Sequence, residues 1–327
     1  MLWLIYRSIM LTVMRSSILV GGQAVIDGVM MRVPGAYATA VRKSDGSIVY
    51  DYHKFISKAS IKGSLSSLPI IRGMIHLYES MRIGYQTLDW SMNVNNPISD
   101  NNNKILDSIL SLLSVLFAIS LFFGTPILVA DFFHNFYEFN NNTLAFNIIS
   151  GLVRIILFLS YLILISFLKD VKRLFQFHGA EHKTVYNFES GEDINIKNAS
   201  SFSKEHPRCG TSFVFIVMLV AIISFTIIDT IASNLGINLS VLNRLLIHIP
   251  CIPLVAGLSY EVLKLIARFQ QYFFFRLLAA PGLLLQKITT KNPNNDQLEV
   301  AISALKHAFG DDLSKYKGKT FNADAIG

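Results

Sequence analysis

The sequence has few charged residues for its length. Asp, Glu, Lys and Arg together make up 16% of the 327 residues, whereas 52% are hydrophobic, and the mean hydropathy is +0.44. A soluble protein of this length builds its core without so apolar a composition, so the excess belongs in a lipid bilayer. With only two cysteines, Cys209 and Cys251, a disulfide framework is not expected.

The chain also lacks a basic stripe with interleaved aromatic residues outside its apolar segments. Its net charge of +7 is therefore not interpreted as nucleic-acid binding, and no nucleic-acid partner is expected. Membrane proteins concentrate Lys and Arg on their cytoplasmic side. The positive charge is explained in this way, with the lipid bilayer as the expected partner.

Four segments are long and apolar enough to span a bilayer, and they predict a mainly α-helical, polytopic membrane protein. They cover residues 105–130, 144–168, 213–235 and 241–265. The fourth contains Pro250 and Pro253, which predict a kink. Lys and Arg are frequent before the first span, between spans two and three, and after span four, but absent from 131–142 and 229–240. Both termini and the 169–212 segment are thus expected in the cytoplasm.

The region before the spans, residues 21–104, resembles a small cytoplasmic α+β unit. Two strand-like runs, 36–43 and 47–54, flank Ser44-Asp45-Gly46 and predict a hairpin. Residues 69–90 predict an amphipathic helix that lies on the membrane or packs on the hairpin. Residues 93–103 are Asn-rich and are expected to form a linker. Residues 1–20 form an apolar extension broken by Arg7 and Arg15, and we predict no function for them.

The domain boundaries follow from these segments. The four-helix membrane domain covers 105–269 and includes the 169–212 segment, which is expected to extend span two as a cytoplasmic helix ending at Gly191. Residues 270–327 contain an interfacial or re-entrant segment, since Arg276 and Pro281-Gly282 argue against a fifth span. Asp296 and Glu299 predict a capping box that opens a last helix to about residue 309.

The strongest candidate for chemistry is His178-Gly179-Ala180-Glu181-His182, which reads H-x-x-E-H. Residues four apart on a helix share one face, so His178 and His182 can bind one metal ion. Glu181 is the candidate catalytic residue, because it could reach a water beside that ion. The same order of letters occurs in an inverted zinc-protease signature. The alternative is an exposed helix whose Glu181 pairs with surface lysines.

A second polar cluster, Glu205 to Ser212, precedes span three and adds His206 and Cys209 as the third and fourth candidate metal ligands. Antiparallel neighbouring spans would bring the two clusters together at one membrane face. A helix N-terminus and Arg208 favour the thiolate of Cys209, which suits metal binding and equally a nucleophilic or redox cysteine. The structural alternative is a rigid turn at Pro207, with Thr211 or Ser212 capping span three.

Two carboxylates are additional candidates. Glu261 lies near the cytoplasmic end of span four, where an ionisable group is costly unless paired, and its alternative role is an ion pair with Lys264. Asp27 lies among glycines in an apolar run, with a tight loop as the alternative. Arg244 and His248, in the outer half of span four, are interpreted as structural or interfacial.

Five blocks in this order resemble the YqhQ-like bacterial membrane family: GGQAVIDGVMMR, HGAEHK, HPRCGTSF, PLVAGLSYE and PGLLLQKITT. The resemblance extends from about residue 21 to the C-terminal helix. It implies a multi-pass protein of the bacterial inner membrane with a domain of unknown function, described as a predicted metal-dependent enzyme. Asp27 stands where the family pattern usually has Glu, which moves the carboxylate by about one bond.

The leading hypothesis is a membrane hydrolase with a divalent metal, zinc, at the cytoplasmic face and an unknown substrate. The ligands would be drawn from His178, His182, His206 and Cys209, and a catalytic site would leave one position open. The second hypothesis is a scaffold or assembly factor with a structural metal site. A transporter ranks third, because no internal repeat is evident. Oligomeric state is not determined by the sequence.

Overall fold

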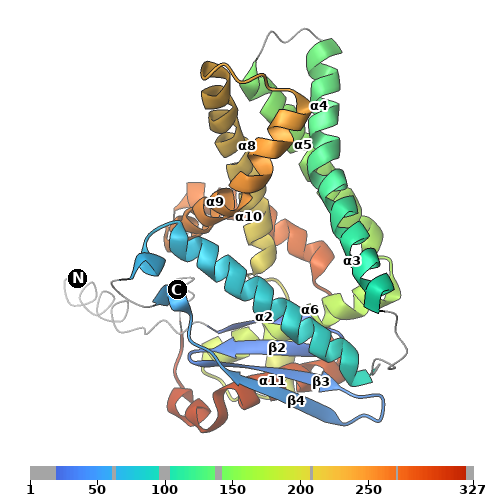
Figure 1. Cartoon of the computed structure of the whole chain (residues 1–327). Coiled ribbons are helices and arrows are strands. Elements are labelled where there is room, and N and C mark those ends of the chain that lie inside the picture. The colour runs from blue at the N-terminus through green and yellow to red at the C-terminus, as the bar shows by residue number, and fades with distance from the viewer. Residues whose placement is uncertain are drawn as a thin grey trace, which may run out of the picture.

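The computed structural model describes residues 20–60, 64–95, 104–136, 142–206, 209–269 and 272–321. Most of the N-terminal extension and residues 96–103 of the expected linker lie outside these ranges. The described chain is mainly helical, with one four-stranded antiparallel sheet before the helices (Figure 1). This confirms the fold class expected from the sequence.

The sheet consists of β1 (Gly21–Val25), β2 (Gly28–Val33), β3 (Ala36–Arg42) and β4 (Ile48–Lys54), in the order β1-β2-β3-β4. The β3–β4 hairpin confirms the prediction. Residues 21–33 do not form the tight loop weighed for the glycine-rich block; they form a second hairpin. Its two-residue turn places Asp27 at φ +54°, a left-handed conformation that Asp tolerates better than most residues.

Helices cover both faces of this sheet. On one face, α6 (Lys169–Ser190) and α11 (Asn295–Phe309) form a core with strand residues such as Met31 and Ala38. On the other face, Met30 and Tyr37 pack with Ile83 of α2 (Ile71–Asn95). Neighbouring Met30 and Met31 therefore point to opposite faces, as the period of a strand requires.

Helix α2 packs through small and polar residues rather than through its apolar stripe. Gly73, Gly84, Thr87 and Ser91 are among its buried residues. An added Cβ on Gly73 would lie 2.8 Å from the carbonyl oxygen of Gly257, which shows how closely α2 crosses α9 (Val241–Arg268). Three apolar residues of the predicted stripe, Ile71, Met81 and Tyr85, are exposed. Helix α2 does pack on the sheet, one of the two predicted arrangements, but through Ile83 rather than through these exposed residues.

Four described helices are long and apolar enough to cross a membrane, as predicted. The first is continuous through α3 (Lys104–Ile119), a π-helical turn (Ser120–Gly124) and α4 (Thr125–Phe136). The others are α5 (Thr143–Ile165), α8 (Gly210–Asn234) and α9. We call the end of this bundle that carries the sheet the sheet side (Figure 1). Helix α9 runs through Pro250 and Pro253 without interruption.

A proline explains the position of Arg154 in the middle of α5. Pro126 has no N–H, so the carbonyl of Phe122, four residues earlier, loses its usual helical donor. The Nε atom of Arg154 donates to that carbonyl at 2.9 Å, and the guanidinium lies 5.1 Å from the ring centre of Phe123. These contacts lower the cost of a cation within the bundle.

Several boundaries differ from the prediction. Helix α6 does not continue span two, because the turn at residues 166–168 separates it from α5. Gly191 does end α6 in the left-handed conformation, at φ +76°. Helix α10 (Phe273–Thr289) continues through Pro281 and Gly282. The capping box of α11 uses Asn294 and Gln297, two residues before the predicted pair, because Asn is an equally good N-cap.

Candidate metal centre

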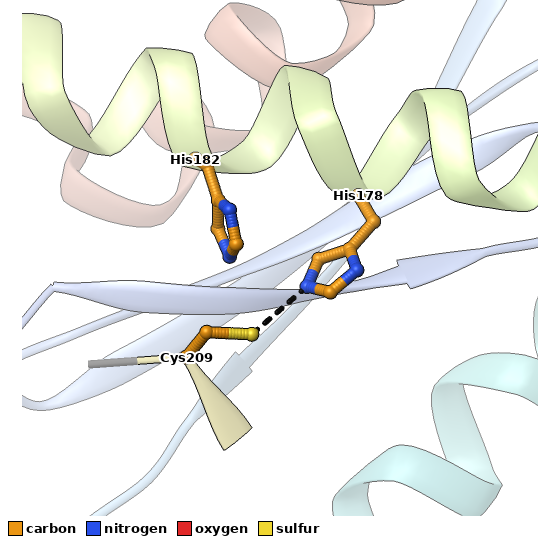
Figure 2. A group of neighbouring side chains, drawn as sticks. All are labelled: His178, His182 and Cys209. Carbon is orange, nitrogen blue, oxygen red and sulfur yellow. Dashed lines mark hydrogen bonds between the residues drawn. The ribbon is translucent and has the colours of Figure 1, made fainter. Parts of the chain in front are cut away.

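Three of the predicted ligands converge at the junction between the sheet-covering helix α6 and the foot of α8. His178 and His182 lie one turn apart on α6, and Cys209 is the N-cap of α8. Their ligand atoms all lie within 4.8 Å of one another, and no other such group occurs among the described residues. His178 Nε2 lies 3.1 Å from Cys209 Sγ, and the His182 ring points toward the same space (Figure 2).

Backbone carbonyls fix both imidazole rings in the orientation that metal binding needs. His178 Nδ1 lies 2.8 Å from the carbonyl oxygen of Thr289, and His182 Nδ1 lies 2.5 Å from that of Lys204. A carbonyl can only accept, so each Nδ1 carries the proton and each neutral ring keeps its lone pair on Nε2. Such hydrogen bonds orient ligating histidines and increase their basicity.

The side chain of Cys209, the N-cap residue of α8, contacts His178 rather than the helix backbone. Its side chain makes no capping hydrogen bond, and Thr211 Oγ1 donates to Sγ at 3.3 Å. The expected capping by Thr211 is therefore replaced by a contact with the sulfur. Cys209 and His178 are half-buried, whereas His182 is 2% exposed, so the accessible part of the cluster is at His178 and Cys209.

Glu181 lies beside the cluster and outside its ligand group. Its side chain is buried, and Oε2 lies 3.4 Å from His182 Nε2, the nitrogen that would bind metal. Strand β1 encloses the carboxylate stem: an added Cβ on Gly22 would lie 2.9 Å from Glu181 Cγ. Because Gly22 has no side chain, the Glu181 side chain can pack directly against β1. This buried position differs from the exposed helix that was the alternative interpretation.

His206 lies near the three ligands without joining them. Its ring centre is 5.7 Å from that of His182, and its Nε2 is 3.3 Å from Glu189 Oε2. Gln286 of α10 holds its backbone from both sides: Oε1 accepts from the His206 N–H at 2.7 Å, and Nε2 donates to its carbonyl at 2.8 Å. Burial lowers the pKa of His206 to about 4, and the nearby Glu181 carboxylate opposes that shift.

The two additional carboxylate candidates have cationic partners elsewhere. Glu261 pairs with Arg72 of α2, whose Nε donates to Oε1 at 2.7 Å, rather than with Lys264. This hydrogen bond raises the pKa of Arg72. Asp27 pairs with Arg173 of α6 and accepts from Asn95 at 3.3 Å. Neither carboxylate belongs to a metal-ligand group among the described residues.

Sequence reasoning missed the groups that support the ligands. Gln286, Thr289 and the Lys204 carbonyl act through contacts between distant segments, and two of them act through backbone atoms. The one available signal was Gln286, a polar residue after the leucine run of α10. It is fully buried, as a hydrogen-bonded core amide should be.

Residues 289–291, at the end of α10 and just after it, cross α6 so closely at Gly179 that no side chain fits there. An added Cβ would lie 2.1 Å from the carbonyl oxygen of Lys291, whose N–H donates to Phe175. We expect Gly179→Ala to displace residues 289–291 and remove the carbonyl that orients His178. If the cluster holds a metal ion as its donor atoms allow, the affinity for added metal should fall about 10–100-fold, the usual effect of losing such a support. Competition with a chelator on the purified protein measures this.

Gly210→Ala is the matched control, because Gly210 adjoins Cys209 and an added Cβ would meet nothing within 4 Å. Its affinity for added metal should equal that of the unmodified protein. Equal affinities for the two variants would contradict the assigned role of Gly179.

Comparisons with known proteins agree with the resemblance stated from the motifs. Residues 68–311 match the family described as "Protein of unknown function (DUF1385)". The chain is 31% identical over 300 residues to the uncharacterized protein YqhQ of Bacillus subtilis (strain 168), covering 87% of this chain and 90% of that protein. No solved structure matches the chain.

Proposed function

The chain belongs to this DUF1385 family, and we propose that it is a zinc-dependent hydrolase. One observation carries the proposal: two imidazole nitrogens and a thiol sulfur converge within 4.8 Å on one side of a buried carboxylate. Both nitrogens are held with their lone pairs available by carbonyl acceptors.

The donor set fits zinc best. Imidazole and thiolate donors favour Zn²⁺ over Mg²⁺ or Ca²⁺, which prefer oxygen ligands. Three protein ligands, one Cys and two His, correspond to catalytic zinc sites, which keep the fourth position open. When bound there, zinc would supply a Lewis acid that polarises a substrate oxygen and acidifies water.

The surrounding residues have distinct roles in this proposal. His178, His182 and Cys209 hold the ion, and Glu181 accepts a proton from the attacking water. Burial keeps Glu181 in place next to His182. Gln286 and His206 tie α10 to the segment that leads into Cys209, so they position the thiolate rather than take part in the reaction.

We place the site at the cytoplasmic face of the bacterial inner membrane. The segments rich in Lys and Arg, residues 32–82, 169–204 and 264–291, lie at or beyond the sheet side of the bundle. The turns at the opposite end lack Lys and Arg. The positive-inside rule then supports a cytoplasmic location for the sheet and both chain ends.

Glu181→Gln tests the catalytic role. Zinc-loaded protein is incubated with total membrane extract, and mass spectrometry follows species that gain the elements of water. The variant should keep its zinc and fold, but hydrolyse about 10²–10⁴-fold more slowly, which is the usual contribution of a general base. The proposal fails if the unmodified protein hydrolyses no component of the extract faster than the variant does.

The second candidate function is a scaffold with a structural zinc site. The ligands join α6 to the foot of α8, and their carbonyl partners come from α10 and the loop before His206. A closed site of this kind would hold the sheet-covering helices to the membrane bundle. It would retain zinc, stability and cellular function in Glu181→Gln.

A further inference from the structure

The depth of the candidate metal centre carries information about its substrate. Cys209 is the N-cap of α8, and the membrane-spanning part of that helix begins at Phe213. Four residues of helix rise about 6 Å. The three candidate ligands therefore lie close to the plane where the bilayer begins, at the depth of lipid head groups.

Helix α10 joins this centre to a lipid-facing surface. Its C-terminal residue Thr289 accepts the hydrogen bond from His178, and its inner side packs on the α8–α9 core through Phe275 and Leu278. Figure 1 shows α10 between the membrane bundle and the sheet. Its outward side exposes large apolar residues: Phe273, Phe274, Leu277 and Leu284 are 58–74% exposed.

The charges on α10 suit the surface of an anionic bilayer. The helix contains no Asp or Glu, and its Arg276 and Lys287 are exposed beside the apolar side chains. An apolar face flanked by cations is typical of helices that lie in the membrane interface.

Among the described residues, those of the centre that face β1 are buried, and those at the start of α8 are exposed. Glu181 and His182 are 5% and 2% exposed behind β1 and the loop before His206. Gly210 is exposed with no atom within 4 Å of an added Cβ, and Val214 on the next turn of α8 is 36% exposed. A substrate thus has its most direct access beside the first turn of α8, at the lipid boundary.

We propose that the substrate is an amphiphile of the bilayer, a lipid or lipid-linked molecule whose reacting bond lies at head-group depth. It reaches the centre along the membrane, past α10, and its apolar part stays in the leaflet during the reaction. This inference rests on the proposed hydrolase function, which it supplies with a substrate class. It does not depend on which bond is cleaved.

The thiol of Cys209 provides a direct test of access. In a Cys251→Ala background it is the one cysteine of the chain. The metal-free full-length protein is placed in vesicles of phosphatidylcholine and phosphatidylglycerol. Labelling is compared for a maleimide on a phospholipid head group, a maleimide on a large hydrophilic polymer, and a small permeant maleimide. The lipid reagent should label Cys209 faster than the polymer reagent.

Substitutions on α10 refine the test. Leu277→Glu with Leu284→Glu should slow the lipid reagent by about tenfold or more, because two leucine side chains leave the apolar phase. Tyr52→Glu, at an exposed position of β4, is the matched control and should label normally. Labelling by the small maleimide confirms that the variants expose the thiol.

The inference is overturned if the polymer reagent labels Cys209 as fast as the lipid reagent, or if the small maleimide reacts and the lipid reagent does not. Zinc protection separates this result from the function itself. Preferential lipid labelling that added zinc does not block would sustain the access route and contradict the zinc site.

Discussion

His182→Ala is expected to reduce bound zinc from about one ion per chain to nearly none. His182 supplies one of three convergent ligand atoms, and its ring is fixed by the Lys204 carbonyl. Loss of a supporting contact alone typically weakens metal binding about 10–100-fold, so loss of a ligand should exceed that range. Metal analysis of purified protein, after loading and removal of free ion, measures the effect.

His206→Ala distinguishes the ligand set in the structure from the larger set predicted by sequence. His206 lies outside the group of three, with its ring nitrogen near Glu189. Its Gln286 contacts are made through backbone atoms, which alanine retains. The variant should therefore keep close to one zinc per chain. Equal loss of zinc from both variants would show that His206 is a fourth ligand.

Asp229→Ala is expected to destabilise the membrane bundle by about 3–5 kcal/mol, because it leaves the buried guanidinium of Arg244 without its carboxylate. Asp229 of α8 is fully buried. It forms an ion pair with Arg244, receives a hydrogen bond from Asn147 at 2.7 Å, and lies 2.9 Å from His248 Nε2. These contacts join α5, α8 and α9. Thermal unfolding in detergent, followed by circular dichroism, measures the loss.

The control for this prediction removes the opposite charge as well. Arg244 is 5% exposed, and its guanidinium lies 3.6 Å from the ring centre of Phe146. Asp229→Ala combined with Arg244→Met should recover part of the lost stability, since methionine fills the space without an unpaired charge. The assignment is wrong if the single variant is as stable as the unmodified protein, or if the double variant is no better.

The membrane architecture was predictable because it depends on local composition. Each span needs about twenty apolar residues, which can be counted without knowing any contact. The β3–β4 hairpin was equally accessible from its Ser44-Asp45-Gly46 turn. The β1–β2 hairpin was not, because glycine is a poor strand former. Gly22 and Gly28 are tolerated there for a tertiary reason: Glu181 and the neighbouring strand approach them closely.

The sequence also could not decide which residues of α2 face outward, because it left packing on the membrane and packing on the hairpin as alternatives. An amphipathic pattern predicts which residues share a face, but not which face is buried. In the structure, the packing face is the one with Gly73 and Gly84, because close approach to α9 and β1 requires small residues. Ile71, Met81 and Tyr85 remain on the outside, whereas Ile83 packs on the sheet.

The sequence by itself determined that this protein spans a membrane and that His178 and His182 share one helix face, since both follow from short-range periodicity. Only the tertiary structure decided which residues complete the cluster. It brought Cys209 within hydrogen-bonding distance of His178, left His206 beside the group, and paired Glu261 and Asp27 with Arg72 and Arg173. Ligand choice depends on distances between segments far apart in the chain, and these are set by how the helices pack.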